Sequence, residues 1–591
     1  MIKRTHTCGE ITSSYIGNTV SLNGWISKTR DLGGLHFIDI RDRYGSTQIV
    51  FNKDINHMAF ERVKKLGFED VIGIKGTVVA RPEEAVKKNI STGEIDVEVT
   101  ELIVYNESTP PPFDINDRNS ASEDHRLKFR YLELRTKDLQ YNIIKRHKAA
   151  IAIRNFMNDR EFIEIETPIL MKSTPEGARD FLVPSRLHSG RFYALPQSPQ
   201  TYKQLLMVSG FDKYFQIVKC FRDEDFRADR QPEFTQIDIE MSFVEQDDII
   251  KLGTDLTKYI WKTVNGIELP QQFPVISYND AMEKYGSDKP DLRFAMELKE
   301  MSSYVEKSDF NAFKSVLESK GRVKGIVCNN ASNYSRKVID ELTEYLQSYF
   351  GAKGLAWMKC SNGILEGGIS KFFNSDLQEQ IISELEMKSD SILFMVGDKS
   401  SIVFSSLGAL RLELAKKEKL IDLNSWKPLW VVDFPLVDWN EDKERWDALH
   451  HPFTSPNLED LNKIDTSPGS VRSLGYDIVM NGYELGGGSI RIHDRDLQSK
   501  IFSLLGIGNE EAQEKFGFLM DAFKFGAPPH GGMAFGFDRI VMLLAGSSQI
   551  RDVIAFPKTT SALSLMDNAP SLVSNDQLEE LNLKIINDSE E

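Results

Sequence analysis

One row of side chains on a predicted strand combines groups that could bind a charged, aromatic ligand. Between Lys213 and Val244, two runs of alternating polar and apolar residues flank a highly charged loop, which predicts an antiparallel hairpin with a long polar tip. Alternate positions of its second strand share one face and carry a ring, an amide and two carboxylates: Phe234, Gln236, Asp238 and Glu240. With Arg222 at the end of the first strand, this row suits a ligand that carries an anion, a flat ring and an amine. The alternative is an edge hairpin whose charges only pair with one another.

Two segments before the hairpin carry residues of similar chemistry. A loop punctuated by glycine and proline holds Glu176 and Arg179. Pro199 can begin a helix on which Gln200 and Lys203 lie about one turn apart on the same face. An exposed lysine on a helix usually has no special role, but the closeness of this one to the hairpin in sequence favours a place in the same site.

The last third of the chain carries a second set of such residues. His450 and His451 precede a proline and lie on opposite sides of an extended segment, which disfavours a shared metal site. A strand-like run that follows bears three charged residues: Asp477, Glu484 and Arg491. Three glycines at 486–488 leave room for a ligand against the backbone, although no phosphate-loop sequence follows them. Farther on, Arg539 stands where a glycine-rich strand runs into an apolar helix, and a guanidinium beside a helix N-terminus makes an anion site.

The N-terminal region predicts a nucleic-acid-binding barrel. Residues 19 to about 106 contain five short strand-like runs separated by glycines and charged turns, which is typical of a small closed barrel of the OB type. On the second run Phe37 alternates with apolar residues, while Arg30 precedes it and Gln48 lies on the next strand. A ring exposed beside an arginine and an amide can stack on an unpaired base and read it. The alternative is that Phe37 is simply buried.

Composition limits the class of protein. The chain of 591 residues has 88 acidic and 72 basic side chains, a net charge of −16, which argues against non-specific coating of nucleic acid. A local basic stretch nevertheless runs from His125 to Lys148. The four cysteines are far apart, so neither a disulfide framework nor a zinc site is indicated. Without an apolar run long enough to cross a bilayer or a signal-peptide core, we expect a cytoplasmic protein.

Changes in sequence pattern, taken with the family resemblance described below, divide the chain into six segments. The sequence pattern predicts a multidomain α/β protein with an OB-type barrel and an inserted α+β domain, and the resemblance implies that the domain around the insertion is catalytic and built on an antiparallel sheet. The expected segments are the barrel, 1–107; a linker stiffened by three prolines, 108–130; the first part of the catalytic domain, 131–287; the inserted domain, 288–429; the second catalytic part, 430–566; and an acidic extension, 567–591. In the third segment, a helix at about 142–158 precedes a strand that ends at Pro168.

Three of these features together resemble the signature motifs of class II aminoacyl-tRNA synthetases. They are the helix and strand that end in proline, the hairpin with FRDED and QPEFTQID, and the GFDR that opens a helix. The barrel, with QSPQ, TPEGARD, HHPFTSP and GGGSIRIH, resembles the bacterial aspartate-specific branch of subclass IIb over almost the whole chain. One departure is Thr201 in QSPQTYKQ, where a larger apolar residue is usual, and there we expect a change in packing and not in substrate.

The resemblance implies that ATP and L-aspartate form an aspartyl-adenylate, from which the aminoacyl group moves to the 3′-terminal ribose of tRNA-Asp. It also implies a homodimer formed through the catalytic domain, with Arg222 and Arg539 as catalytic residues. The implied ATP contacts are Arg222, Asp223, Glu224, Gln231, Phe234, Glu484, Gly536, Phe537, Asp538 and Arg539. The implied aspartate contacts are Glu176, Gln200, Lys203, Arg222, Gln236, Asp238, His450 and Arg491. Asp477 and Glu484 would bind Mg²⁺, and the anticodon would be read by Arg30, Leu32, Phe37 and Gln48.

Selection of aspartate requires cations, because a second carboxylate must leave water. Lys203 and Arg491 would supply them, with Asp238 holding both in orientation, whereas asparagine would leave one cation unpaired. Three alternatives stay open: an enzyme that also charges tRNA-Asn, an asparaginyl or lysyl enzyme, and a non-catalytic tRNA-binding protein. In the family that the chain resembles, a leucine at the position of Leu32 favours strict charging of tRNA-Asp.

Overall fold

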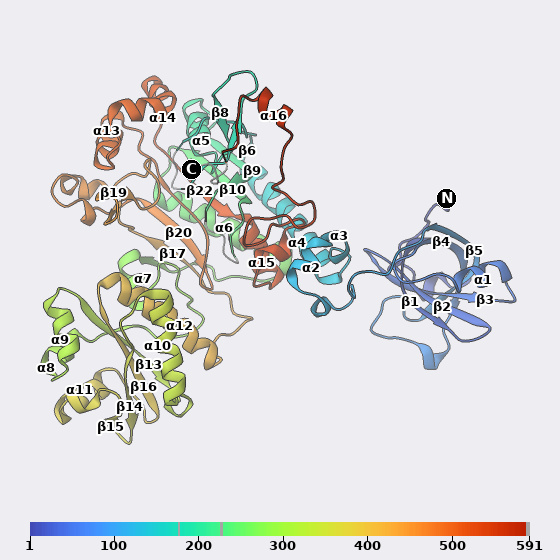
Figure 1. The fold of residues 1–591 in the computed structure, drawn as a ribbon, viewed down its shortest axis with the longest axis horizontal. Helices are drawn as coiled ribbons and strands as arrows, with labels where there is room; N and C mark the ends of the chain where they lie inside the picture. The colour runs from blue at the N-terminus through green and yellow to red at the C-terminus, as the bar shows by residue number, and fades with distance from the viewer. Residues whose placement is uncertain (175–177, 225–228, 587–591) are drawn as a thin grey trace. The chain divides into compact units, whose positions relative to one another are not determined.

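The computed structural model describes residues 1–174, 178–224 and 229–586. The chain divides into two compact units (Figure 1). The first comprises Met1–Ile144 and Arg551–Leu572, and the second comprises Lys145–Ile550 and Val573–Glu591. Glu176, one of the predicted aspartate contacts, lies outside the described residues.

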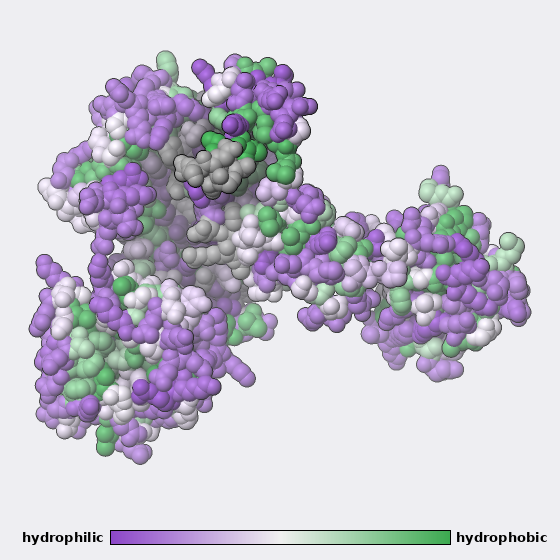
Figure 2. Space-filling model, viewed as in Figure 1, coloured by the Kyte–Doolittle hydropathy of each residue, from purple (hydrophilic) through white to green (hydrophobic). Residues whose placement is uncertain are grey.

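The first unit contains a closed five-stranded barrel in the order β1-β2-β3-β5-β4, so the predicted barrel is confirmed. Its strands are β1 (Thr19–Asp31), β2 (Leu35–Asp42), β3 (Gly45–Asn52), β4 (Val71–Ala80) and β5 (Ile95–Asn106). Ile38 and Ile40 fill the core from β2, while Phe37, in the alternate row, is half-buried. The helix α1 (His57–Val63) between β3 and β4 is capped by the Asn56 side chain and was not predicted. On the barrel face seen in Figure 2, hydrophilic side chains predominate between smaller apolar patches.

A short helical region completes the first unit. It consists of α2 (Glu123–Lys128), α3 (Arg130–Glu133) and the start of α4 (Lys137–Asn158), a helix that begins earlier than predicted. The carboxylate of Glu133, fully buried, accepts hydrogen bonds from three guanidinium groups: Arg118, Arg126 and Arg130. Arg130 also donates to the carbonyl oxygens of Arg551 and Ile554, which ties the C-terminal segment to these helices.

The second unit is organised around an eight-stranded sheet in the order β11-β17-β20-β21-β22-β10-β9-β6. Its strands are β6 (Ile163–Glu164), β9 (Lys213–Phe221), β10 (Glu233–Ser242), β11 (Val275–Ser277), β17 (Pro428–Val432), β20 (Gly475–Met480), β21 (Tyr483–Ile490) and β22 (His530–Gly536). Neighbours pair antiparallel except at the two edges, where β11 with β17 and β9 with β6 are parallel. The predicted hairpin is confirmed, with Phe221 of β9 opposite Glu233 of β10.

Helices and two small hairpins surround this sheet. The helices are α5 (Gln200–Val208), α6 (Gln246–Asn265), α13 (Arg495–Leu504), α14 (Asn509–Ala522), α15 (Phe537–Ala545) and α16 (Asn575–Glu580). The hairpins pair β7 (Leu182–Pro184) with β8 (Phe192–Ala194), and β18 (Val437–Asn440) with β19 (Arg445–Ala448). Within the described ranges, no helix combines the length and apolar character needed to cross a membrane.

A separate five-stranded sheet is inserted between two neighbouring strands of the large one. The strands β11 and β17, with α7 (Tyr278–Tyr285) between them, form a β–α–β crossover, and the inserted sheet follows α7 in the chain. Its order is β12-β13-β16-β14-β15, from β12 (Lys299–Glu300), β13 (Arg322–Asn329), β14 (Ala356–Ser361), β15 (Ile364–Glu366) and β16 (Ser391–Asp398). Its helices are α8 (Ser302–Lys307), α9 (Asn311–Glu318), α10 (Arg336–Phe350), α11 (Ser375–Glu384) and α12 (Ser400–Lys417).

The strand β16 forms the centre of this inserted domain. Its alternate residues enter two different cores, Ile392 and Phe394 on one side and Leu393 and Met395 on the other. Burial of both faces explains why its sequence is a continuous apolar run. The expected combination of a barrel, an antiparallel sheet and an inserted α+β domain is therefore the observed fold class.

Candidate active site

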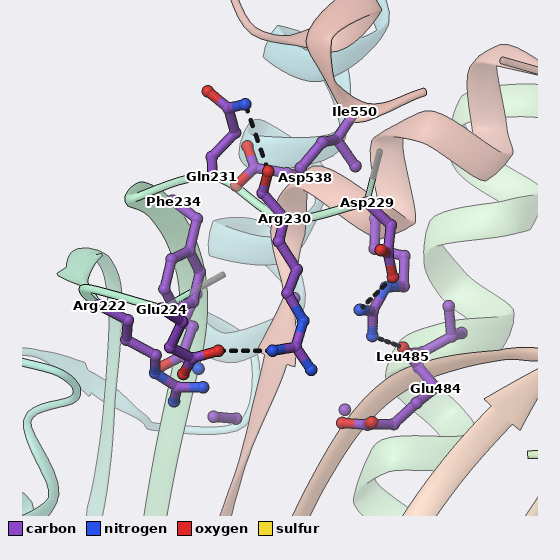
Figure 3. Close-up of a pocket in the computed structure, with 15 residues that line it drawn as sticks. Arg222, Glu224, Asp229, Arg230, Gln231, Phe234, Glu484, Leu485, Asp538 and Ile550 are labelled. Atoms are coloured by element: carbon purple, nitrogen blue, oxygen red, sulfur yellow. Dashed lines mark hydrogen bonds and ion pairs between the residues drawn. The ribbon is translucent and has the colours of Figure 1, made fainter. Parts of the chain in front are cut away.

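The hairpin, β21 and the junction of β22 with α15 line one pocket (Figure 3). Eight of the predicted ATP contacts line it: Arg222, Glu224, Gln231, Phe234, Glu484, Gly536, Asp538 and Arg539. The other two lie elsewhere. Phe537 is 2% exposed and packs under the guanidinium of Arg146, while the backbone N–H of Asp223 donates to the carbonyl oxygen of Arg179.

Arg222 and Phe234 lie on the same side of this pocket in Figure 3. The guanidinium carbon of Arg222 is 5.1 Å from the centroid of the Phe234 ring, within the range of a cation–π contact. Its Nε atom is buried without a hydrogen-bond partner in the described part of the chain. Such a buried N–H can donate a hydrogen bond to a bound ligand without first breaking another one, so binding requires little reorganisation.

The motif that opens α15 divides into a ligand-facing residue and an anchoring one. Asp538 accepts hydrogen bonds from the backbone N–H of Thr235, at 2.7 Å, and from Nη1 of Arg146, at 2.5 Å, so it fixes α15 to β10 and α4. Arg539 donates to the carbonyl oxygen of Glu484 and lies 3.4 Å from the carboxylate of Asp229. Asp538 therefore anchors the helix, and the guanidinium of Arg539 faces the pocket.

Arg230 also lines this pocket but was not predicted. Its Nη1 atom donates to the carboxylate of Glu224 at 2.5 Å, and Figure 3 shows the side chain extending between Phe234 and Glu484. It lies in the charged hairpin tip, where the sequence offers several arginines with the same local pattern. No sequence signal separates it from its neighbours.

A second pocket adjoins the first and shares Arg222, Gln236 and Glu484 with it. Seven of the eight predicted aspartate contacts line it: Gln200, Lys203, Arg222, Gln236, Asp238, His450 and Arg491. They come from α5, the hairpin, the segment before β20 and the residue that follows β21. The structure therefore brings together residues that lie up to 291 positions apart in the chain, from Gln200 to Arg491.

The two predicted cations meet on one carboxylate. Nζ of Lys203 lies 2.7 Å from Oδ1 of Asp238 and 3.3 Å from Oε2 of Glu240. Arg491 donates to both oxygens of Glu240, at 3.0 and 3.2 Å. All four side chains are at most 4% exposed. Asp238 was predicted to hold both cations; in the structure Asp238 binds Lys203, and Glu240 binds Lys203 and Arg491.

Glu240 is thus a residue of the candidate site that the site prediction left out. The signal that could have identified it was its place in the same strand row as Asp238. Burial raises the pKa of the Asp238 carboxyl to about 6, against the opposing effect of Lys203. Burial also acts to raise the pKa of Glu240, but Arg491 and Lys203 outweigh it and hold that pKa below its ordinary value. Glu240 therefore remains an anion between the two cations.

The two adjacent histidines have different surroundings. Nε2 of His450 lies 3.6 Å from Oδ1 of Asp477; although burial opposes protonation, this carboxylate raises the pKa of His450. His451 accepts from the backbone N–H of Phe453, and burial, followed by the field of Arg491, holds its pKa well below the ordinary value. Of these two histidines, only His450 has a carboxylate as an ion-pair partner within the described residues.

Asp477 and Glu484, the predicted Mg²⁺ ligands, lie on neighbouring strands and both line the second pocket. Asp477 pairs with Gly487 and Val479 pairs with Glu484, so an extra residue in β21 places Glu484 and Gly487 on the same side of the sheet. No cluster of three or more potential metal ligands occurs among the described residues. Two carboxylates suit Mg²⁺, which is usually bound by one or two carboxylates together with substrate phosphates and water.

The three glycines allow the strands to approach closely. A Cβ atom on Gly488 would lie 2.0 Å from the carbonyl oxygen of Gly532 in β22, and one on Gly487 would lie 2.0 Å from Oδ1 of Asp477. The first contact is with backbone and the second with a side chain of the site. The glycines therefore make room for the neighbouring strand and for Asp477.

The predicted anticodon contacts gather at one end of the β1–β2 hairpin. Arg30 and Phe37 are directly opposite each other, and Nη2 of Arg30 donates to Oε1 of Gln48 at 2.7 Å. Leu32 follows β1 and is 70% exposed. Gln48 in turn donates to Asp96 at 3.0 Å, which fixes its amide orientation.

Comparison with known proteins identifies the family. A family model for class II tRNA synthetases of the D, K and N types matches residues 122–560, and one for OB-fold nucleic acid binding domains matches residues 20–105. The aspartate–tRNA ligase of Staphylococcus carnosus is 54% identical over 587 residues, 99% of this chain and 100% of that protein. The aspartate–tRNA(Asp/Asn) ligase of Thermoanaerobacter pseudethanolicus is 52% identical over 584 residues, 99% of this chain and 98% of that protein.

A solved structure shares the fold. The asparaginyl-tRNA synthetase of Pyrococcus horikoshii, complexed with asparaginyl-adenylate, matches with a TM-score of 0.59 at 20% identity and covers 95% of this chain and 99% of that one. Together with the family models and the full-length relatives, the match confirms the resemblance found in the sequence motifs. The chain belongs to the class II aminoacyl-tRNA synthetases and, within them, to the aspartate–tRNA ligases.

Proposed function

We propose that this protein activates L-aspartate with ATP and transfers the aspartyl group to the 3′-terminal ribose of tRNA-Asp. The observation that carries the proposal is the joint burial of Lys203 and Arg491 on Glu240, beside the pocket that contains Arg222 and Phe234. The paired cations would receive the side-chain carboxylate of aspartate. The adjoining pocket would receive the nucleotide.

The arrangement explains how aspartate would be chosen over asparagine. Glu240 fixes the positions of both cations before the substrate arrives, so little ordering is left for the moment of binding. A carboxylate can accept hydrogen bonds from both Lys203 and Arg491. The amide of asparagine would place an N–H against a buried cation, which costs a few kcal/mol.

Positioning and charge neutralisation would carry the activation step. The substrate carboxylate is itself the nucleophile, so no general base is required. Arg222 would stabilise the negative charge that develops at the α-phosphate, and the adenine ring would stack on Phe234. Arg539 would bind the terminal phosphate from the helix N-terminus. Asp477 and Glu484 would hold Mg²⁺, which neutralises phosphate charge when it is bound.

Pyrophosphate exchange tests this proposal. Aspartate should support ATP–pyrophosphate exchange, while asparagine and lysine should not. Arg491→Leu should lower aspartate-dependent exchange at least a hundredfold, because it removes one of the two cations proposed to face the substrate carboxylate and leaves Glu240 with one cation. Arg491→Lys, which keeps the charge but loses the forked contact with Glu240, should retain part of the activity. Near-normal exchange by a folded Arg491→Leu protein would remove this residue from the pocket.

The choice of tRNA is a further part of the proposal. Relatives named for tRNA-Asp alone and for both tRNA-Asp and tRNA-Asn are about equally similar to this chain. Leu32 is exposed, and the leucine that discriminating members of the family tend to carry at this position favours strict charging of tRNA-Asp. Aminoacylation of purified tRNA-Asp and tRNA-Asn with aspartate would distinguish the two enzymes.

We also propose a homodimer that acts in the cytoplasm. Four apolar side chains on α4, on β6 and just after it are 40–51% exposed: Ile151, Ile163, Ile169 and Leu170. The edge strand β6 has an unpaired side, and exposed apolar groups beside such an edge favour burial against a second copy. Sedimentation of the full chain at micromolar concentration tests this; a monomer would contradict it.

A further inference from the structure

The turn between α1 and β4 binds the chain on both sides of the proline-rich linker. Asp70, 3% exposed, accepts a hydrogen bond from the backbone N–H of Ser108 at 2.6 Å. Its neighbour Glu69, 5% exposed, accepts one from Nη1 of Arg135 at 2.7 Å. Ser108 begins the linker and Arg135 follows it, so two adjacent acidic residues of the barrel hold both of its ends.

Glu69 is itself fixed firmly to the barrel. Arg41 of β2 donates to both of its carboxylate oxygens, at 2.7 and 2.8 Å, and its backbone N–H donates to the carbonyl oxygen of Ile26 at 2.8 Å. Its φ angle is +69°, in the left-handed region that L-residues adopt rarely. The barrel therefore maintains a strained backbone at the residue that binds Arg135.

Arg135 contacts the barrel at a second point. Its guanidinium carbon lies 5.2 Å from the centroid of the Trp25 ring, and Trp25 is directly opposite Arg41 in the β1–β2 pairing. Arg135 is 29% exposed and therefore half-buried between a ring and a carboxylate. Two residues later α4 begins at Lys137, and this helix continues beyond Ile144.

From these contacts we infer that Arg135 is a positioning residue, which holds the barrel in a fixed orientation at the start of α4 so that one tRNA can be bound by the barrel and by the active site together. The inference rests on the proposed tRNA-charging function. When one tRNA binds at two sites, attachment at the first site raises the effective concentration of the tRNA at the second. A flexible connection between the two sites lowers this effective concentration. No other described residue bridges Glu69 to the helices that follow the linker.

Arg135→Gln tests the inference because it removes the bridge and leaves the Arg41–Glu69 pair inside the barrel. Aspartate-dependent pyrophosphate exchange, which requires no tRNA, should stay within about twofold of wild type. Charging of tRNA-Asp should fall about tenfold, as the advantage of double attachment is lost. Charging of the same tRNA with a replaced anticodon, already weak, should change little.

Binding of an isolated anticodon stem–loop distinguishes a misplaced barrel from a damaged one. Its affinity should be unchanged by Arg135→Gln, and Arg135→Lys should restore part of the charging rate. Equal losses with both tRNAs, no loss with either, or weaker stem–loop binding would each overturn the inference. If wild-type protein fails to exchange pyrophosphate with aspartate, the proposed function fails first, independently of Arg135.

Discussion

Asp238 and Glu240 share a strand row but differ in how firmly they hold their charge. Glu240 has two cationic neighbours and Asp238 has Lys203 alone as an ion-pair partner within the described chain. Burial accordingly raises the pKa of Asp238 to about 6 and leaves that of Glu240 below its ordinary value. Below about pH 6 Asp238 takes up a proton, and the pocket gains one unit of positive charge.

This difference predicts how selectivity depends on pH. Aspartate and asparagine differ in side-chain charge and share the same ammonium group, so a more positive pocket favours aspartate. The inhibition constant of asparagine divided by the Michaelis constant of aspartate should rise about tenfold as the pH falls through 6. In Asp238→Asn the ratio should be independent of pH in this range. A slope that survives in this variant would point to His450, whose pKa is also raised.

At the scale of the element, neighbouring glycines of β21 should respond differently to the same change. Alanine at Gly488 would place its methyl group against the backbone of β22, so Gly488→Ala should lower stability by about 2–3 kcal/mol. In Gly487→Ala the methyl group would instead displace the Asp477 carboxylate. This variant should keep a near-normal melting temperature and need severalfold more Mg²⁺ for half-maximal pyrophosphate exchange. Equal melting temperatures for the two variants would contradict the distinction.

The helix α5 contains one buried hydroxyl group that we expect to lower the stability of the fold. Thr201 is fully buried, and its hydroxyl has no hydrogen-bond partner among the described residues. Valine has the same shape without the hydroxyl, so Thr201→Val should stabilise the protein by about 1 kcal/mol. Thermal unfolding measures this, and exchange activity should be unchanged. Thr201→Ser, which keeps the hydroxyl and removes a methyl group, is the matched control and should be less stable than wild type.

Element patterns could be predicted from the sequence where they depend on local alternation. The barrel strands and the β9–β10 hairpin each have one apolar face, and this pattern identifies them. The bridge from Arg491 to Glu240 spans 251 positions, and a pairing over that distance depends on packing that no local pattern contains. The extra residue in β21 was missed for the same reason, since only its pairing with β20 reveals it. The sequence alone therefore did not distinguish Glu240 from the other charged residue of its strand row.

At the scale of the whole molecule, a change in the proposed anticodon site should lower tRNA charging without affecting pyrophosphate exchange. Phe37 belongs to the first unit, and the residues proposed to carry the exchange reaction belong to the second. Phe37→Ala removes a stacking surface worth about 1–3 kcal/mol, so charging of tRNA-Asp should fall about tenfold or more. Pyrophosphate exchange should be nearly unaffected. A parallel loss in both assays would mean that the ring supports the fold of the barrel.

The inserted five-stranded domain interrupts a crossover that is complete without it. Strand, helix and strand would still follow one another if α7 were joined to β17 by a short loop, because crossovers of this kind need only a few connecting residues on each side of the helix. The domain therefore behaves topologically as a cassette: it can be exchanged, shortened or replaced by a reporter protein while the order of strands in the large sheet is preserved.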